Sequence, residues 1–377
     1  MGGFQPITAV AISGAFVFGI VLALLGSIKL SLAKRLQISE TQVGMLLSAL
    51  NLALVPMMLL SGVLIDWWGV RAVLILGSVL VCVAVYGLTL RKTFRWAVAA
   101  ILLVGLGAAA VSAASVVLMP RAFYEGRNDL IGAALNLGMA FFALGALVTP
   151  ALVDTLLRRI EFARTLALLA ILCLVPALLA AATPIPGEAH GANLSGVLQD
   201  RYLWLAALVF FLYAPLEASV GAWATTFLME VGHQERRAAW LLSGFWLTFL
   251  ASRLLAALLL IQASSWVIFA LAMLAAVVLG NMSSGSTRER ARLELLVLGA
   301  VLGPILPTLV GLVFAHFPHQ HGTAYGAMFA LGSLGSLVMC PAIGWWVRHH
   351  AVAQSLRIPM FIALGMGAAA LVLGLHL

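Results

Sequence analysis

Twelve long apolar stretches, separated by short polar breaks, limit what this chain can fold into more than any other feature. A helix needs about 20 apolar residues to cross the hydrocarbon of a bilayer, and each stretch has roughly that length. Only 9% of the 377 residues are charged, whereas soluble domains carry roughly 25%. The chain is therefore predicted to be an all-α integral membrane protein with a retained first span. The spans are expected near 7–29, 41–64, 71–90, 97–119, 129–153, 165–183, 202–227, 238–261, 265–281, 293–315, 323–347 and 357–376.

The middle of the chain carries a long polar break with helix-breaking residues such as Pro184. On either side of it the sequence repeats faintly, since Leu-Gly-Ala-Leu-Val at 144–148 resembles Leu-Gly-Ser-Leu-Val at 334–338. Many transporters are built from internal repeats, with the solute site between them. Chance similarity among helices rich in Gly, Ala and Leu is the alternative. The predicted organisation is a six-helix bundle at 1–183, a cytoplasmic linker at 184–201 and a second six-helix bundle at 202–377.

Charge and motifs exclude several classes of function. The net charge is +8 and the pI about 10, but the cations lie in short loops between spans, where they belong to the membrane surface. We therefore expect the bilayer, and no nucleic acid, as a partner. The sequence contains no phosphate-binding loop, nucleophile elbow or dinucleotide fingerprint. The three cysteines show no paired or metal-ligand spacing. An enzyme, a cofactor and a metal are accordingly not expected.

A polar turn lies between the second and third spans and contains Gly62, Asp66, Gly69 and Arg71. A carboxylate at the end of a span needs water, a cation or free helix N–H groups. With Leu64, the turn resembles the G-x-L-x-D-x-x-G-x-R signature of the major facilitator superfamily. The resemblance implies a twelve-helix transporter in which the Asp pairs across the domain interface and holds one alternating-access state closed. The plain alternative is an ordinary charged turn between two hydrophobic helices.

Two charged residues lie deep within spans, Glu217 in the seventh and Arg253 in the eighth. A charge there is a functional candidate because it costs a few kcal/mol or more to place. Tyr213 falls on the same helical face as Glu217, and Trp223 is within reach of it. Glu217 is a candidate to bind a polyhydroxylated ligand, to accept a proton or to hydrogen-bond a neighbouring helix. At 1.5 Å per residue, Arg253 lies about 10 Å from the depth of Glu217, so it is expected to hold carbonyls or an anionic group instead.

The seventh and eighth spans also resemble one branch of the superfamily, the fucose, galactose and glucose proton symporters. The resemblance rests on Tyr213, Glu217 and Trp223, on Gly244-Phe245-Trp246 followed by Arg253, and on the segment from Asn136 to Pro150. It implies a sugar-like solute and a coupled proton. Proton-coupled sugar porters of that branch place acids in their first and fourth helices, whereas 7–28 and 97–119 contain neither Asp nor Glu here. The neutral candidates for a central cavity include Asn51 and Asn136.

These observations predict a secondary active transporter that moves a small polar organic solute, sugar-like or an organic anion, by alternating access. Proton coupling is left open. The alternatives are efflux of amphipathic compounds or lipids, and a transporter-like ligand sensor. We expect a monomer in a bacterial cytoplasmic (inner) membrane. The candidate substrate and coupling residues are Glu217, Tyr213, Trp223, Asn136, Asn51, Trp246 and Arg253, and the candidate gating residues are Gly62, Asp66, Gly69 and Arg71.

The cations are divided unevenly between the ends of the predicted bundles. If both termini are cytoplasmic, the cytoplasmic turns hold Arg71, Arg121, Arg127 and Arg201, and the opposite turns hold sixteen cations. The positive-inside bias argues for the reverse orientation, whereas the family resemblance places the Asp66 turn in the cytoplasm. We favour the family orientation. The sixteen are Lys29, Lys34, Arg35, Arg91, Lys92, Arg95, Arg158, Arg159, Arg164, Arg236, Arg237, Arg288, Arg290, Arg292, Arg348 and Arg357.

Overall fold

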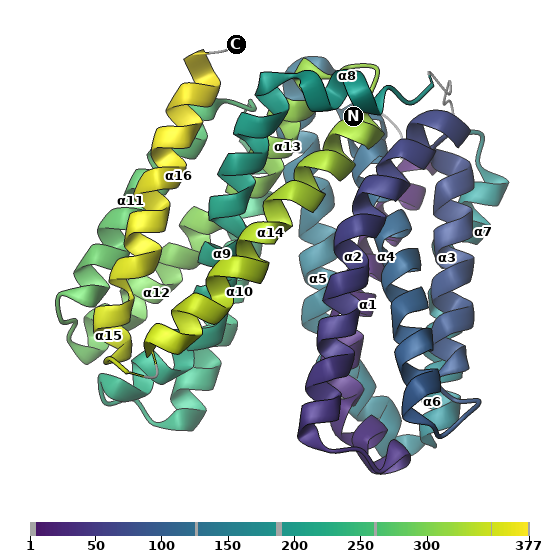
Figure 1. The fold of residues 1–377 in the computed structure, drawn as a ribbon, viewed down its shortest axis with the longest axis horizontal. Coiled ribbons are helices and arrows are strands. Elements are labelled where there is room, and N and C mark those ends of the chain that lie inside the picture. The colour runs from purple at the N-terminus through teal and green to yellow at the C-terminus, as the bar shows by residue number, and fades with distance from the viewer. Residues whose placement is uncertain (1–4, 125–126, 186–190, 260–261, 348, 376–377) are drawn as a thin grey trace. The chain divides into compact units, whose positions relative to one another are not determined.

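The fold is seen in a computed structural model, which describes residues 5–124, 127–185, 191–259, 262–347 and 349–375. These residues form helices and connecting turns and no strand. Within these described ranges, twelve helical segments are long and apolar enough to cross a membrane, which confirms the predicted number of spans. The helices (Figure 1) are α1 (Pro6–Leu36), α2 (Glu40–Trp68), α3 (Val70–Gly87), α4 (Phe94–Ala122), α5 (Ile131–Arg159), α6 (Phe162–Leu172), α7 (Val175–Ala182), α8 (Leu194–Gln199), α9 (Arg201–Glu230), α10 (Glu235–Leu258), α11 (Ser265–Ser283), α12 (Arg288–Leu302), α13 (Ile305–His316), α14 (His321–Val347), α15 (Val352–Ser355) and α16 (Arg357–Leu375).

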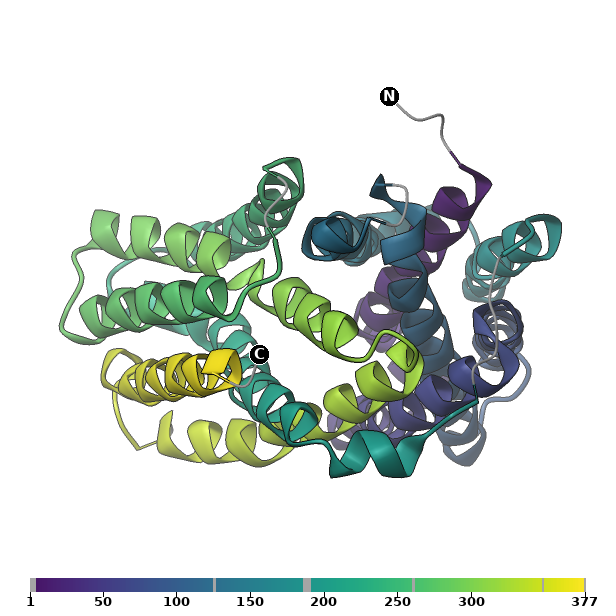
Figure 2. The same cartoon turned by 90° about the horizontal axis from the view of Figure 1, so that it is seen from above.

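The chain folds into two compact units. Three spans consist of two helices in succession, namely α6 with α7, α12 with α13, and α15 with α16. In the second unit, the green helix α11 and the yellow helix α16 lie side by side in both views (Figures 1 and 2). Each unit takes a short segment from the other half of the sequence. The first unit is Met1–Asn128, Gly138–Leu194 and Phe317–Gly326, and the second is Asp129–Leu137, Ser195–His316 and Ala327–Leu377. Part of the expected central linker, 186–190, lies outside the described residues.

The faint sequence repeat marks an equivalent helix crossing in each unit. In the first unit, a Cβ on Gly145 of α5 would clash with the carbonyl oxygen of Phe16 in α1. In the second unit, a Cβ on Gly335 of α14 would clash with the carbonyl oxygen of Phe211 in α9. Small residues let membrane helices approach this closely. The two glycines, which lie 190 residues apart, therefore occupy matching positions in the two units.

A second pair of crossings follows the same pattern. Gly105 of α4 packs directly on the backbone of α2 at Leu50, and Gly299 of α12 packs on the backbone of α10 at Phe245. The glycines are 194 residues apart and the residues they meet are 195 apart. The internal repeat thus extends over several helices of each unit, so a position in one unit can be compared with its counterpart in the other.

Replacing Gly335 with Ala is expected to lower the melting temperature of the detergent-solubilised protein by several degrees. The added methyl group meets the backbone of α9, which has to shift, and overpacking of this kind costs about 1–3 kcal/mol. Gly365→Ala is the matched control, because its Cβ would make an ordinary contact, 3.7 Å from a Leu212 methyl carbon. Equal melting temperatures for the two variants would show that the α9–α14 crossing is not tightly packed.

Candidate functional site

The polar turn between α2 and α3 is organised around Gly69. Its φ is 87°, a region in which a side chain would be strained. Gly69 therefore ends α2 at Trp68 and begins α3 at Val70 without an intervening loop. Arg71, in the first turn of α3, donates from Nη2 to the carbonyl oxygen of Ala181 at the end of α7, over 2.6 Å. The turn thus joins three helices of the first unit.

Asp66 lies in the last turn of α2 and caps the start of α14. Its Oδ1 accepts from the backbone N–H of Gly322 at 3.1 Å, and its Oδ2 from that of Thr323 at 2.7 Å. The first N–H groups of a helix have no partner within it and attract negative charge. The carboxyl group is buried, so these contacts are shielded from water. Gly62, one turn earlier, permits the approach because a Cβ there would clash with the carbonyl oxygen of Gly322.

Residues 191–193, the strap, are hydrogen-bonded to the same region. Gly191, in the segment before α8, donates its N–H to the backbone carbonyl oxygen of Asp66 at 3.2 Å. The side chain of Gln320 then bridges to this strap, because Nε2 donates to the Gly191 carbonyl oxygen and Oε1 accepts from Asn193 N–H, both over 2.9 Å. Sequence reasoning missed Gln320, and no local signal marks it because its partners lie more than 120 residues away.

A polar network lies within the membrane-spanning part of the second unit. It surrounds the break between α12 and α13, which falls at Gly303 and Pro304. In an uninterrupted helix, the Gly303 carbonyl oxygen would accept from the N–H of residue 307, but Pro307 has none. Arg253 supplies the missing donor, with its Nε 2.8 Å from the Gly303 oxygen. Arg253 as a whole is only 2% exposed, and its guanidinium carbon also lies 4.4 Å from the centroid of the Phe249 ring.

Tyr213 connects Arg253 with Glu217. Its hydroxyl donates to the carbonyl oxygen of Leu302 at 3.1 Å, and it interacts electrostatically with the side chains of both charged residues. Direct pairing of Glu217 and Arg253 was not expected from the helix geometry. Tyr213, one turn before Glu217 on α9, instead interacts electrostatically with both of them. The three side chains therefore couple α9 and α10 to the break in the tenth span.

The two predicted tryptophans have different neighbours. Trp246 packs edge-on against Phe249, with ring centroids 5.5 Å apart and an angle of 69°, and so continues the Arg253 network along α10. Trp223 lines an apolar cavity of the second unit together with residues such as Leu279 and Leu298. The structure thus joins Trp246 to the network through Phe249, and Trp223 lines the apolar cavity.

The two asparagines differ in burial. Asn51 is exposed on α2 and bonds the Leu47 carbonyl oxygen of its own helix at 3.1 Å. Asn136 is fully buried at the start of α5, where its Nδ2 donates to the Gly132 carbonyl oxygen at 2.9 Å. Among the described residues, the Asn136 side-chain oxygen has no hydrogen-bond partner. Oδ1 of Asn136 is therefore a buried hydrogen-bond acceptor inside the second unit that a donor group could occupy.

Comparison with known proteins places this arrangement in context. A sequence profile described as the Major Facilitator Superfamily matches residues 11–339. No curated protein sequence matches the chain. Among solved structures, a variant of the E. coli fucose:proton symporter superposes with a TM-score of 0.80 at 17% identity, over 97% of this chain and 98% of that one. The proton:xylose symporter bound to 6-bromo-6-deoxy-D-glucose gives 0.76 at 16%, over 97% and 94%. The human organic anion transporter gives 0.74 at 16%, over 98% and 100%.

Proposed function

Because the chain belongs to the major facilitator superfamily, we propose that it is a secondary active transporter that moves a small polar organic solute, sugar-like or an organic anion, by alternating access. The protein is integral to the membrane. We further propose that it is a monomer in the bacterial inner membrane. The observation that carries it is the network of Glu217, Tyr213 and Arg253 at the broken tenth span. Similarity to two sugar:proton symporters and an organic anion transporter supports the solute classes.

The network supports proton coupling because the Tyr213 hydroxyl has a single hydrogen and more than one possible acceptor. The Tyr213 hydroxyl has one hydrogen to donate, and the Leu302 carbonyl oxygen accepts it at 3.1 Å; the Glu217 carboxylate, which interacts electrostatically with Tyr213, is the second acceptor that we propose to compete for it. When Glu217 is ionised, it takes that hydrogen. When Glu217 is protonated, it donates to the Tyr213 oxygen instead and leaves the hydroxyl hydrogen for Leu302. The protonation of Glu217 thereby decides whether Tyr213 holds the break between α12 and α13.

The turn at Asp66 supports the conformational half of the mechanism. We propose that the bond between Asp66 and the start of α14 holds one alternating-access state closed, with the Gln320 strap reinforcing it. Charge-assisted hydrogen bonds of this kind contribute about 1.5–3 kcal/mol each. Energies of this size can set the populations of two states that differ by a few kcal/mol.

Tyr213→Phe is expected to lower pH-driven accumulation of solute about tenfold, because each tenfold corresponds to about 1.4 kcal/mol, the size of one buried hydrogen bond. Tyr202→Phe is the matched control, since Tyr202 is also a buried tyrosine of α9 and its hydroxyl has no hydrogen-bond partner among the described residues. Accumulation is measured in proteoliposomes with an imposed pH gradient. If both variants accumulate like the unaltered protein, Tyr213 does not link Glu217 to the tenth span.

The proposal as a whole is tested by counterflow. Solutes are first selected by a thermal-shift screen of sugars, organic acids and lipids on the purified protein. The best sugar or organic acid is then loaded into proteoliposomes at high concentration, and uptake of a labelled trace from outside is followed. A transporter exchanges the label, whereas a ligand sensor binds it without exchange. Binding without counterflow would therefore overturn the proposed function.

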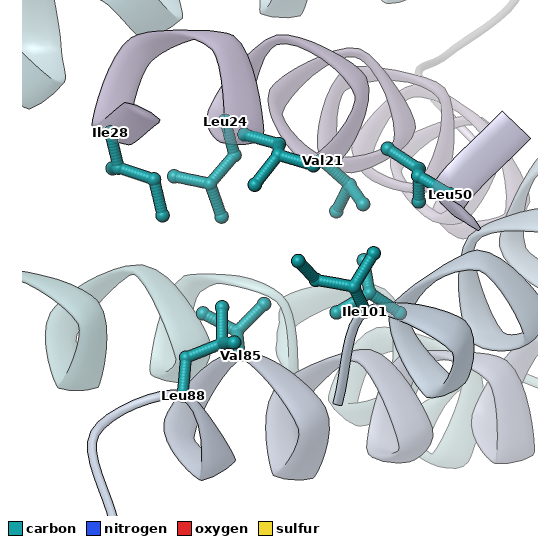
Figure 3. A pocket seen from close by; sticks show the side chains of 9 residues that line it. Val21, Leu24, Ile28, Leu50, Val85, Leu88 and Ile101 are labelled. Atoms are coloured by element: carbon teal, nitrogen blue, oxygen red, sulfur yellow. The ribbon is translucent and has the colours of Figure 1, made fainter. Parts of the chain in front are cut away.

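Efflux of amphipathic compounds is the second candidate, and one observation favours it. The spans of α1 and α4 carry no acidic residue, and a cavity of the first unit is lined only by aliphatic side chains (Figure 3). Helices without acidic side chains suit a solute with an apolar body. The thermal-shift screen separates the two candidates, since efflux predicts stabilisation by amphipathic cations or lipids rather than by sugars or organic acids.

A further inference from the structure

The turn between α9 and α10 contains a buried histidine, His233, that has no part in the proposed transport mechanism. Gly232 has a φ of 92°, which lets the chain leave α9 sharply. The N–H of His233 then donates to the carbonyl oxygen of Leu228 at 2.9 Å, a helix-ending contact of the Schellman type. His233 is only 4% exposed, although its neighbours Gly232 and Gln234 are exposed.

The His233 ring is held by one residue of the tenth span. Arg288, at the start of α12, places its backbone carbonyl oxygen 3.0 Å from Nε2 of the ring. The guanidinium of the same residue reaches the other ring nitrogen, with its Nε 3.3 Å from Nδ1. Both nitrogens of the buried ring are thus occupied, and the contact joins the α9–α10 turn to the start of α12.

The chemistry of these two partners determines the protonation of the ring. A carbonyl oxygen only accepts hydrogen bonds, so Nε2 must carry a hydrogen. A guanidinium only donates, so Nδ1 must offer its lone pair. Both contacts therefore form only with a neutral imidazole. A proton added to Nδ1 would set two N–H groups and two positive charges against each other, and the contact with the guanidinium would be lost.

The other charged groups of these elements have partners of their own or are exposed. Glu230, at the end of α9, accepts from two backbone N–H groups of α15. Glu294 is buried on α12 and hydrogen-bonded to Ser286 in the turn before that helix. Among the residues that the structure describes, only Arg288 bonds the His233 ring, so no carboxylate there favours its protonated form. The exposed charged residues nearby in sequence are Glu235, Arg236, Arg237, Glu289, Arg290 and Arg292.

The contact joins the same three helices as the Arg253 network, at the other end of α12. Tyr213 and Arg253 link α9 and α10 to the break between α12 and α13. His233 links the end of α9 and the start of α10 to Arg288. The 15 residues of α12 separate the two contacts, which amounts to about 22 Å at 1.5 Å per residue. The first half of the tenth span is therefore held at both ends.

We propose that the contact between His233 and Arg288 is an acid-released latch on the tenth span. Histidine side chains ordinarily take up a proton between about pH 5 and 8. At higher pH the ring is neutral and the latch holds. Acid on this face protonates the ring, and because the protonated ring fits only the open state, it shifts the equilibrium toward release of the start of α12. The consequence for transport rests on the proposed function, whereas the latch itself does not.

Hydrogen–deuterium exchange, read by mass spectrometry on the full-length protein in detergent, tests the latch. Peptides that cover 228–240 and 284–294 are followed at about pH 7.5 and about pH 5.5. His233→Gln is the reference, because an amide donates to the carbonyl and accepts from the guanidinium as the neutral ring does, but does not titrate. The exchange rate of the unaltered protein is divided by that of the reference at the same pH, which removes the intrinsic effect of pH.

This ratio of rates is expected to rise about tenfold from the higher to the lower pH, which corresponds to the loss of about one hydrogen bond. The same ratio at both pH values would overturn the proposal. Solute plays no part in the measurement, so a failure of the latch would leave the proposed transport untouched, and a failure of counterflow would leave the latch untouched.

Two further variants locate the response. Arg288→Met removes the guanidinium but keeps the carbonyl oxygen, which both protonation states of the ring can bond. It serves as a second reference if His233→Gln does not fold, and the ratio against it should rise in the same way. His349→Gln is the matched control, because His349 is exposed and bonds the Trp345 carbonyl oxygen of α14. It should keep the full response to acid. Loss of the response in His349→Gln would contradict the assignment to His233.

Discussion

Replacing Glu217 with Gln is expected to abolish accumulation of solute driven by a pH gradient, while exchange of solute across the membrane continues. Gln keeps the shape and the hydrogen-bonding capacity of Glu217 but cannot take up or release a proton. In the variant, Tyr213 faces the same neutral partner at every pH, so the break in the tenth span no longer responds to protonation. The measurement is the ratio of internal to external labelled solute in proteoliposomes. That ratio should fall to about one, because no gradient remains coupled to the solute.

The control for this variant is Glu235→Gln, which neutralises an exposed acid in the first turn of α10. It should accumulate solute as the unaltered protein does. Continued accumulation against a gradient by Glu217→Gln would mean that Glu217 serves structure or solute binding alone. The protein would then be a uniporter or would couple to another ion.

Replacing Asp66 with Asn is expected to slow exchange about tenfold and to leave the equilibrium affinity for solute within a few-fold. The change removes the charge that favours the N–H groups of Gly322 and Thr323, and a loss of about 1.4 kcal/mol corresponds to a factor of ten in an equilibrium constant. Asp66 contacts the start of α14 and lies in a different unit from the Glu217 network. Its loss is therefore expected to shift a conformational equilibrium and to remove no binding contact.

Affinity is measured by calorimetry and exchange by counterflow, on the same preparation. Asp154→Asn is the comparison, because Asp154 forms an exposed pair with Arg158 of the kind that contributes little. It should alter neither quantity. A collapse of affinity in Asp66→Asn, with an unchanged exchange rate per bound solute, would place Asp66 at the solute site and refute its conformational role.

The spans and the polar turn could be predicted from local features of the sequence. Apolar length alone defines each span, and Gly69 needs a backbone conformation that other residues avoid. The partner of Asp66 could not be predicted in this way. The Gly322 and Thr323 amides lie 256 and 257 residues further along the chain, and a backbone N–H carries no residue-specific signal. Only the tertiary fold brings them together.

The intramembrane network was predictable in part. Arg253 was expected to hold carbonyl oxygens or an anionic group, and it bonds the Gly303 carbonyl oxygen. Pro307 was the signal that identifies this oxygen, since a proline leaves the carbonyl four residues earlier without its helical donor. The link from Glu217 to Arg253 was not predicted, because a separation in depth along straight helices takes no account of Tyr213, which interacts with both residues.

The cavities lay beyond sequence reasoning for a different reason. Aliphatic residues on buried helix faces look the same in sequence whether they pack against one another or leave space between them. Trp223, which was expected within reach of Glu217, is one of the residues that line the apolar cavity of the second unit.

Solute-induced proton movement in proteoliposomes tests the central claim most directly. The sugar or organic acid selected by the thermal-shift screen is added outside, with no imposed gradient, and a pH-sensitive dye reports the external medium. The mechanism predicts a rise of external pH with the unaltered protein, because each solute that enters carries a proton inward through Glu217. It predicts no change of pH with Glu217→Gln. Solute uptake by the unaltered protein without any pH change, or the same pH rise in the variant, would contradict it.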